Sequence, residues 1–310
     1  MRKLSHSRAR SPRATSPVTL AALIARGARR LERAGVFFGH GTDNAWDESA
    51  ALTLHALGVP FGAPSKAYPR RVGLKGQAAA RALIERRVHE RIPAPYLIGL
   101  TGFAGLIFEV DPRVLIPRSP LAELIERRFV PWIDPARVRR VLDLGTGSGC
   151  IAIACARAFA RARVDATDVE AGALAVARLN VRRHRLGRRV RVVKSDHFRA
   201  LGRAAYDIIV SNPPYVGARE LAALPPEYRH EPRLALAAGT DGLASVRTIL
   251  REARRHLRPR GILVVEVGNT ESSVQRAFPR LPFTWLTFER GGGGVFVLTA
   301  EQLAGAARRR

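Results

Sequence analysis

Apolar residues recur at helical spacing in the first hundred residues of the chain. Between Thr19 and Ala34 they share one face of a predicted helix, and they are Leu20, Leu23, Ile24, Ala28 and Leu31. Two further helices are predicted over Asp47–Leu57, with acidic residues in its first turn, and over Gln77–Arg91, which a proline-rich stretch follows. We therefore expect a small helical domain over residues 18–95.

The pattern changes over residues 96–116, where glycines are interleaved with apolar residues. The glycines are Gly99, Gly102 and Gly105, and the apolar residues are Phe103, Ile107, Phe108 and Val110. This arrangement predicts a β-hairpin that links the helical domain to the rest of the chain.

From residue 138 onward, short apolar runs alternate with helix-like segments. Strands are predicted over residues 138–144, 163–167, 190–193, 206–210, 261–267, 283–288 and 295–298. Helices are predicted over residues 150–160, 171–184 and 246–257. This alternation is typical of a doubly wound α/β domain with a mostly parallel sheet, here expected over residues 117–302. The Arg-rich ends, residues 1–17 and 303–310, are predicted to be basic tails, the first of them disordered.

A glycine-rich turn joins the first of these strands to a helix. Asp143 ends the strand, and Gly145, Thr146, Gly147 and Gly149 follow it. Glycines let the backbone turn tightly and approach a ligand, and the helix N-terminus offers free amides to an anionic group. An acidic residue here suits the ammonium group of an amino-acid ligand better than a pyrophosphate, which it would repel.

The next two predicted strands also end in acidic residues. Asp168 can accept hydrogen bonds from both hydroxyls of a ribose, Asp196 can accept from an adenine amino group, and His197 can stack on that ring. Each aspartate alone could equally be a helix N-cap. All three at the carboxyl edge of one sheet favour a nucleoside-containing amino acid such as S-adenosylmethionine.

The fourth strand is followed by Ser211-Asn212-Pro213-Pro214-Tyr215. The two prolines stiffen the loop and remove two amide donors, which leaves carbonyl oxygens and the Asn212 side chain as acceptors. Such acceptors can hold both hydrogens of a planar NH2 group, and Tyr215 offers a flat face for stacking. The loop therefore predicts methyl transfer to a planar amide or amine nitrogen, with a glutamine amide and adenine both open as substrates.

Charge adds a class of partner to this picture. The 310 residues include 52 Lys and Arg against 26 Asp and Glu, and only four of the basic residues are lysine. A net charge of +26 suggests a nucleic acid, a ribosome or an acidic surface as partner, although a biased genomic composition would explain the arginines as well.

Other features of the composition predict a protein of a reducing compartment, the cytoplasm. The two cysteines, Cys150 and Cys155, fall on one predicted helix and are not expected to form a disulfide. The sequence has no clustered His and Cys pattern that suggests a metal site, and no apolar run of roughly 18 residues that could span a membrane.

Taken together, these motifs resemble the class I glutamine-N5 methyltransferases that act on translation proteins, the HemK-like family. The resemblance covers residues 20–305 and is carried by the glycine-rich turn and the Asn-Pro-Pro-Tyr loop. It favours the branch that acts on ribosomal protein L-three over the branch that acts on release factors. Segments similar to the former are Gly39–Glu48, Arg91–Leu97, Val114–Pro120, Glu227–Pro232, Pro282–Leu286 and Gly294–Phe296.

This resemblance implies a methyltransferase that uses S-adenosylmethionine as co-substrate and a helical N-terminal domain that recognises the protein substrate. It also implies a seven-stranded sheet whose last strand is antiparallel. The implied cofactor contacts are Asp143, Gly145, Gly147, Asp168 and Asp196. Asn212 and the Pro213 carbonyl are implied to hold the substrate amide, with Tyr215 nearby and Phe103 walling the site. The implied partner is ribosomal protein L-three or a ribosome assembly intermediate, with a weak rRNA contact through the basic surface.

Three other functions compete with this one. The same fold could methylate the amino group of adenine in DNA or RNA, or the glutamine of a release factor. A non-catalytic ribosome-binding module is a further alternative, against which the intact Asp143, Asp168 and Asn212 argue. A nucleic-acid enzyme must extrude its base and usually carries a recognition domain, whereas residues 18–95 have no obvious helix-turn-helix or zinc module.

Overall fold

The computed structural model describes residues 17–308, with side-chain surroundings to residue 305. The chain divides into two compact units, between Leu97 and Ile98. The predicted tail over residues 1–17 lies outside the described residues except for Pro17. Within the described part, no helix is both long and apolar enough to cross a membrane.

The first unit is built from three helices, as the sequence predicts. They are α1 (Leu20–Arg33), α2 (Ala45–Ala56) and α3 (Leu74–Glu90), and a two-residue strand pair, β1 (Val18–Thr19) and β2 (Arg71–Val72), closes one end. The side chain of Thr19 caps α1 by accepting from the Ala22 amide. The apolar stripe of α1 supplies the buried Leu20, Leu23 and Ile24 to the core of this unit.

A buried ion pair joins α2 to α3 inside this unit. Arg87 Nε donates to Glu48 Oε1 at 2.7 Å, and neither side chain is exposed. Arg87 also donates to the carbonyl oxygen of Phe37, so the guanidinium joins α2, α3 and the segment after α1. A charge so deeply buried is tolerated only because it is paired and hydrogen-bonded.

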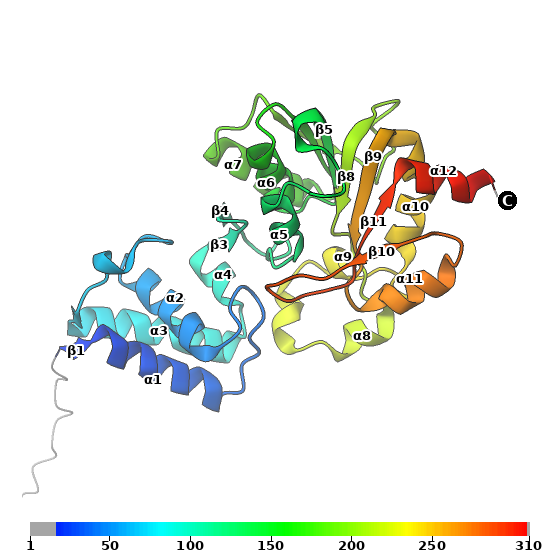
Figure 1. Cartoon of the computed structure of the whole chain (residues 1–310). Helices are drawn as coiled ribbons and strands as arrows, with labels where there is room; N and C mark the ends of the chain where they lie inside the picture. Colours follow the sequence, from blue (N-terminus) through cyan, green and yellow to red (C-terminus); the bar gives the residue numbers. More distant parts are fainter. Residues whose placement is uncertain (1–16, 309–310) are drawn as a thin grey trace, which may run out of the picture. The chain divides into compact units, whose positions relative to one another are not determined.

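The second unit begins with a hairpin and contains a seven-stranded sheet (Figure 1). The hairpin pairs β3 (Leu100–Phe103) with β4 (Leu106–Glu109), after the short helix α4 (Ala94–Ile98). The sheet has the order β10-β11-β9-β8-β5-β6-β7. Its strands are β5 (Arg140–Leu144), β6 (Arg163–Asp168), β7 (Val190–Lys194), β8 (Tyr206–Ser211), β9 (Leu257–Glu266), β10 (Thr284–Leu286) and β11 (Val295–Thr299). The last strand, β11, is antiparallel to both of its neighbours, as expected, and the pairs from β9 to β7 are parallel.

Helices cover both faces of this sheet (Figure 1). One face packs against α5 (Leu121–Glu126), α6 (Cys150–Ala158) and α7 (Ala171–Arg183), and the other against α10 (Ala244–His256), α11 (Glu271–Ala277) and α12 (Ala300–Arg308). Within β5, Val141 faces the first core and Leu142 the second, which is the alternation of a strand with two buried faces. The predicted doubly wound fold is confirmed.

The end of the chain differs from its prediction as a basic tail from residue 303. The structure continues α12 to Arg308, and Leu303 is buried against the second core. The helix forms because this apolar side chain has a hydrophobic surface to cover, whereas the arginine content alone suggested a solvated tail. The short helices α8 (Ala218–Ala223) and α9 (Arg233–Leu236) follow β8.

Candidate active site

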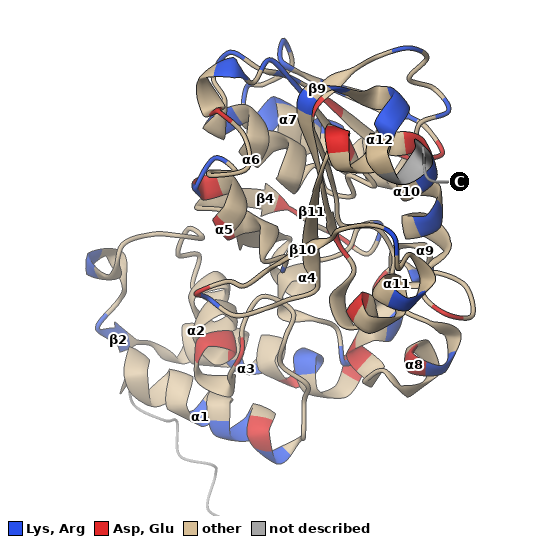
Figure 2. Ribbon diagram, turned by 45° about the vertical axis from the view of Figure 1, so that its right-hand side comes forward, with Lys and Arg blue, Asp and Glu red and all other residues tan. Residues whose placement is uncertain are grey.

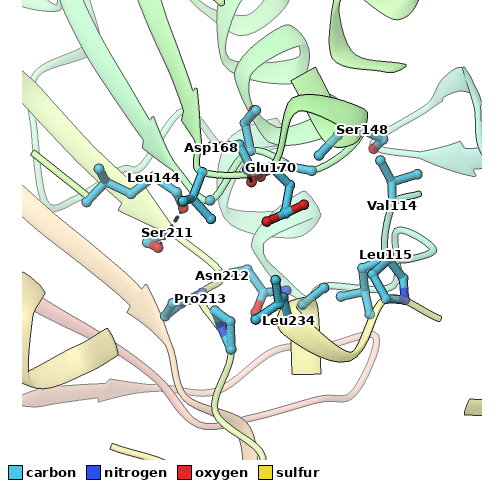
Figure 3. A pocket seen from close by; sticks show the side chains of 18 of the residues that line it. Val114, Leu115, Leu144, Ser148, Asp168, Glu170, Ser211, Asn212, Pro213 and Leu234 are labelled. Atoms are coloured by element: carbon cyan, nitrogen blue, oxygen red, sulfur yellow. Dashed lines mark hydrogen bonds between the residues drawn. The ribbon is translucent and has the colours of Figure 1, made fainter. Parts of the chain in front are cut away.

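A cavity of about 290 Å³ lies at the carboxyl ends of the parallel strands (Figure 3). The chain order reverses direction there, because β5 lies between β6 and β8. In open α/β sheets such a switch point is where ligands bind, since the loops diverge to opposite faces. The cavity is walled by the loops after β5, β6, β7 and β8, by residues 113–119 and by α9.

The glycine-rich turn forms one wall of the cavity. Gly145, Gly147 and Gly149 have φ values of 70°, 54° and 81°, a left-handed conformation that favours glycine. Gly145 and Gly147 line the cavity, whereas Gly149 caps α6, where an added Cβ would lie 3.3 Å from the Cβ of Ala177. The backbone of the turn can therefore contact a ligand in the cavity directly, because Gly145 and Gly147 have no side chain in between.

Asp143 anchors this turn from behind the cavity. Its Oδ2 accepts from Thr146 Oγ1 at 2.5 Å and from the Ala152 amide at 3.0 Å. The side chain is fully buried and does not line the cavity, and its Oδ1 has no hydrogen-bond partner among the described residues. Burial raises the pKa of this carboxyl to about 7. A buried carboxylate oxygen without a hydrogen-bond partner, next to the glycine-rich turn, is suited to a cationic group of a ligand.

Asp168 lines the cavity at the end of β6. Its Oδ2 accepts from the Gly147 amide at 2.9 Å and its Oδ1 from the Glu170 amide at 3.0 Å. Burial is the largest influence on this carboxyl and raises its pKa. Asp168 thus fixes the tip of the glycine turn and still faces the cavity, where a carboxylate can accept from hydroxyl groups.

Asp196 and His197 line the cavity after β7. His197 Nδ1 lies 2.7 Å from Asp196 Oδ1, and Arg199 pairs with the other oxygen at 2.9 Å. The hydrogen bond with His197, aided by Arg199, lowers the pKa of Asp196. Both acceptor oxygens are therefore engaged, but the carboxyl remains partly exposed to the cavity.

Asn212 and Pro213 lie across the cavity from Asp168 and Ser148 (Figure 3), and Pro214 also lines the cavity. Ser211 ends β8 and donates through Oγ to the Leu144 carbonyl at 2.7 Å, which ties this loop to the glycine turn. The side-chain amide of Asn212 makes no hydrogen bond within residues 17–308, so its oxygen is available to a ligand. The prolines hold this loop stiff around that acceptor.

Tyr215 is held behind this loop rather than at the cavity surface. Its hydroxyl donates to Glu266 Oε1 at 3.3 Å, and Ser119 Oγ donates to Glu266 Oε2. A Cβ on Gly268 would lie 2.5 Å from the ring, so the ring packs directly on the backbone. Burial raises the pKa of Glu266 to about 7 and also raises that of Tyr215.

A bidentate ion pair, which was not predicted from the sequence, braces another wall of the cavity. Arg118 donates to both oxygens of the buried Glu231 at 2.6 Å, and the Ile116 amide donates to Glu231 Oε1 at 3.0 Å. The Arg118 guanidinium also lies 5.4 Å from the centre of the Tyr228 ring. These contacts join residues 113–119 to the segment before α9. The signal in the sequence was only that both segments carried the family resemblance.

The structure brings most of the predicted residues together around the cavity. Those that line it are Gly145, Thr146, Gly147, Asp168, Asp196, His197, Asn212, Pro213 and Pro214. Asp143, Gly149 and Tyr215 lie behind its walls, and Phe103 is buried in the first core against Phe108. Phe103 is therefore not at the cavity surface, because its hairpin packs it into the hydrophobic core. Within the described part of the chain, no group of three or more His, Cys, Asp or Glu residues could hold a metal ion.

Comparison with known proteins places the chain in a family. A model of the methyltransferase small domain matches residues 127–224. The ribosomal protein uL3 glutamine methyltransferase of Bordetella pertussis is 46% identical over 92% of this chain and 96% of its own length. The chain belongs to the family of ribosomal protein uL3 glutamine methyltransferases.

A further member of the family and one solved structure are also similar to this chain. The family member of Neisseria meningitidis is 46% identical over 89% of this chain and 91% of its own length. The crystal structure of the hMettl16 catalytic domain with MAT2A 3'UTR hairpin 1 covers 90% of each chain with a TM-score of 0.50 and 16% identity, which shows a shared fold alone. The predicted branch of the family and the class I methyltransferase fold are confirmed, and membership implies use of S-adenosylmethionine.

Proposed function

We propose that this chain transfers a methyl group from S-adenosylmethionine to the side-chain amide nitrogen, N5, of a glutamine in ribosomal protein uL3. The observation that carries the proposal is the unpartnered Asn212 amide at the cavity wall, in a chain that matches uL3 glutamine methyltransferases over nearly its whole length. We propose residues 18–95 as the domain that recognises the protein substrate.

The residues around the cavity divide into a cofactor side and a substrate side. Gly145, Thr146 and Gly147 form the cradle for the amino-acid part of the cofactor, with Asp143 behind them to balance its ammonium charge. Asp168 would accept from the ribose hydroxyls, and Asp196 and His197 would hold the adenine, since all three line the cavity. S-adenosylmethionine supplies an electrophilic methyl group on a sulfonium sulfur.

The substrate side holds a weak nucleophile in place. An amide nitrogen attacks poorly because its lone pair is delocalised, so orientation supplies much of the rate. The oxygens of Asn212 and Pro213 accept from the two amide hydrogens and favour the positive charge that develops on nitrogen. As the nitrogen–methyl bond forms, the methyl–sulfur bond breaks and leaves a neutral thioether, and one of the amide hydrogens passes to water as a proton. Tyr215, fixed by Glu266 and Gly268, supports the loop from behind.

A labelling experiment tests the proposal. The protein is incubated with methyl-labelled S-adenosylmethionine and, separately, purified uL3, a release factor, duplex DNA or an assembly intermediate of the large subunit. Label in a glutamine of uL3 is expected, either free or within the intermediate. Label confined to DNA or to the release factor would overturn the proposal.

The role of Asn212 has its own test. Asn212→Ala is expected to lower methyl transfer by at least about 100-fold, in the range of losses seen when one transition-state hydrogen bond is removed. Binding of S-adenosylmethionine, measured by calorimetry, is expected to stay within about threefold, since this side chain acts on the substrate. Full transfer by the variant would show that Asn212 does not hold the amide.

A further inference from the structure

The first unit contains a second, larger hollow that the proposed reaction does not use. This groove has a volume of about 770 Å³ and is walled by α1 and α3. Its charged lining consists of five arginines and a single glutamate, namely Arg26, Arg29, Arg30, Arg33, Arg81 and Glu85. We propose that this arginine groove binds the phosphate backbone of RNA.

The arginines of α1 form a row along the groove. Arg26, Arg29, Arg30 and Arg33 are spaced at i, i+3, i+4 and i+7, which places them on one face of the helix over two turns of about 5.4 Å each. Arg81 faces them from α3, and basic residues recur along α1 in Figure 2. A row of guanidinium groups at this spacing can contact successive phosphates of one strand.

Most of this charge is not neutralised within the protein. Arg30 pairs with Glu85 across the groove at 2.7 Å, which fixes the two helices relative to each other. In the part of the chain that the structure describes, Arg26, Arg29, Arg33 and Arg81 pair with no carboxylate, and all four are exposed. An ordinary solvated helix face alternates charges of both signs, whereas this row has a single paired acid.

The chemistry of the lining favours a nucleic-acid backbone over bases. Guanidinium groups bind phosphate oxygens through two hydrogen bonds at once. Among the described residues that line the groove none is aromatic, so none offers a ring on which a base could stack, and the buried lining residues Leu23, Ala80 and Ile84 are aliphatic. Binding is therefore expected to depend on shape and charge rather than on base sequence.

The choice of RNA among polyanions rests on the proposed function, because the proposed substrate is a ribosomal protein, which itself binds ribosomal RNA. Each phosphate contact releases condensed counterions, so affinity falls with salt by a logarithmic slope of about 0.7–0.9 per contact. Four contacts would contribute a slope of about 3, which the loss of the four groove arginines would remove.

The test compares two full-length variants that lose the same charge. The groove variant carries Arg26→Gln, Arg29→Gln, Arg33→Gln and Arg81→Gln. The control variant carries Arg161→Gln, Arg178→Gln, Arg188→Gln and Arg203→Gln, four exposed arginines of the second unit. Binding of a fluorescein-labelled RNA hairpin is measured by anisotropy between roughly 50 and 200 mM salt.

The groove variant is expected to bind the hairpin at least about tenfold more weakly, with a salt slope lower by about 3, and the control variant to stay within about threefold of the wild type. Equal losses in both variants would mean that net charge alone drives binding, and would overturn the proposal. Unchanged RNA binding by the groove variant would also overturn the proposal. This holds even if the variant binds free uL3 more weakly, because the groove would then serve the protein substrate and not RNA.

A methylation readout separates this inference from the proposed reaction. In the groove variant, transfer to uL3 within an RNA-containing intermediate is expected to fall further, relative to the wild type, than transfer to free uL3. If the wild type binds RNA through the groove but labels no form of uL3, the proposed function fails and the RNA site stands. If it labels uL3 and the groove variant binds RNA normally, the RNA site alone fails.

Discussion

Gly27 shows how a single missing methyl group sets the packing of the first unit. It lies in the middle of α1, where Ala would ordinarily be the better helix former by about 1 kcal/mol. A Cβ at this position would lie 2.2 Å from Ser49 Oγ, which donates to the Ile24 carbonyl at 2.8 Å. The close approach of α1 and α2 therefore requires glycine.

Gly27→Ala is expected to destabilise the protein by about 1–3 kcal/mol, because overpacking outweighs the gain in helix propensity. Urea unfolding of both variants checks this. Gly305→Ala is the matched control, since Gly305 also lies in a helix but has no atom within 4 Å of its would-be Cβ. The control is expected to be neutral or slightly stabilising, and a similar result at Gly27 would contradict the packing reason.

At the residue scale, the sequence predicts a functional side chain best when a local pattern marks it. Asp168 and Asn212 were predicted because they follow predicted strands, and the structure places both at the cavity. Glu231 and Glu266 were not predicted as site residues. Their partners, Arg118 and Ser119, are 113 and 147 residues away in the chain. A pattern of neighbouring residues cannot indicate a pair at such a separation.

At the element scale, length decides what the hydrophobic pattern can predict. The long helices α1, α3, α7 and α10 were all predicted, within three residues at each end. Helices α8, α9 and α11, of six, four and seven residues, were missed. So few residues give no readable periodicity, and such helices depend on tertiary contacts for their stability.

One element-scale prediction concerns the ion pair that braces residues 113–119. Arg118→Met is expected to cost about 3–5 kcal/mol of stability, because it leaves the buried Glu231 carboxylate without its cation. Methyl transfer is expected to fall as well, since the loop loses its attachment. Restoring a neutral pair with Glu231→Gln in the same chain is expected to recover part of the stability.

Chemical unfolding of the two single variants and the double variant measures the coupling between the residues. Arg113→Met serves as the control, since its ion pair with Asp111 is exposed and is expected to be worth less than about 1 kcal/mol. Equal losses at Arg118 and Arg113 would show that the buried pair does not brace the loop.

At the scale of the whole molecule, the alternation of strands and helices was enough to predict the architecture. The connection from a strand through a helix to the next parallel strand is almost always right-handed, which leaves few possible arrangements of β5 to β9. Both faces of the sheet are covered by helices, as expected. The change of pattern after residue 95 predicts a division of the chain close to Leu97, but it gives no signal that the hairpin belongs to the second unit.

The buried carboxyls Asp143 and Glu266 give the whole molecule a pH dependence with a definite sign. Burial raises both pKa values to about 7, from 3.8 and 4.5 respectively. Between about pH 4 and 7, the folded protein therefore holds protons that the unfolded chain has released. The stability that these groups contribute is fully present below pH 4 and is lost as the pH rises through 7.

Glu266→Gln isolates one of these groups, because glutamine keeps the shape and has no charge to bury. The stability of the wild type relative to this variant is expected to fall by about 3 kcal/mol between pH 4.5 and 7 and to level off above it. Urea unfolding at several pH values measures the difference.

Glu301→Gln is the contrasting control, because the Arg260 amide lowers the pKa of the exposed Glu301. The stability that Glu301 adds is present above the unfolded pKa and is lost as the pH falls through the folded pKa. The stability of the wild type relative to Glu301→Gln is therefore expected to rise with pH, opposite to the result for Glu266→Gln. A flat curve for Glu266→Gln would mean that this carboxyl is already ionised at pH 5 despite its burial beside Tyr215.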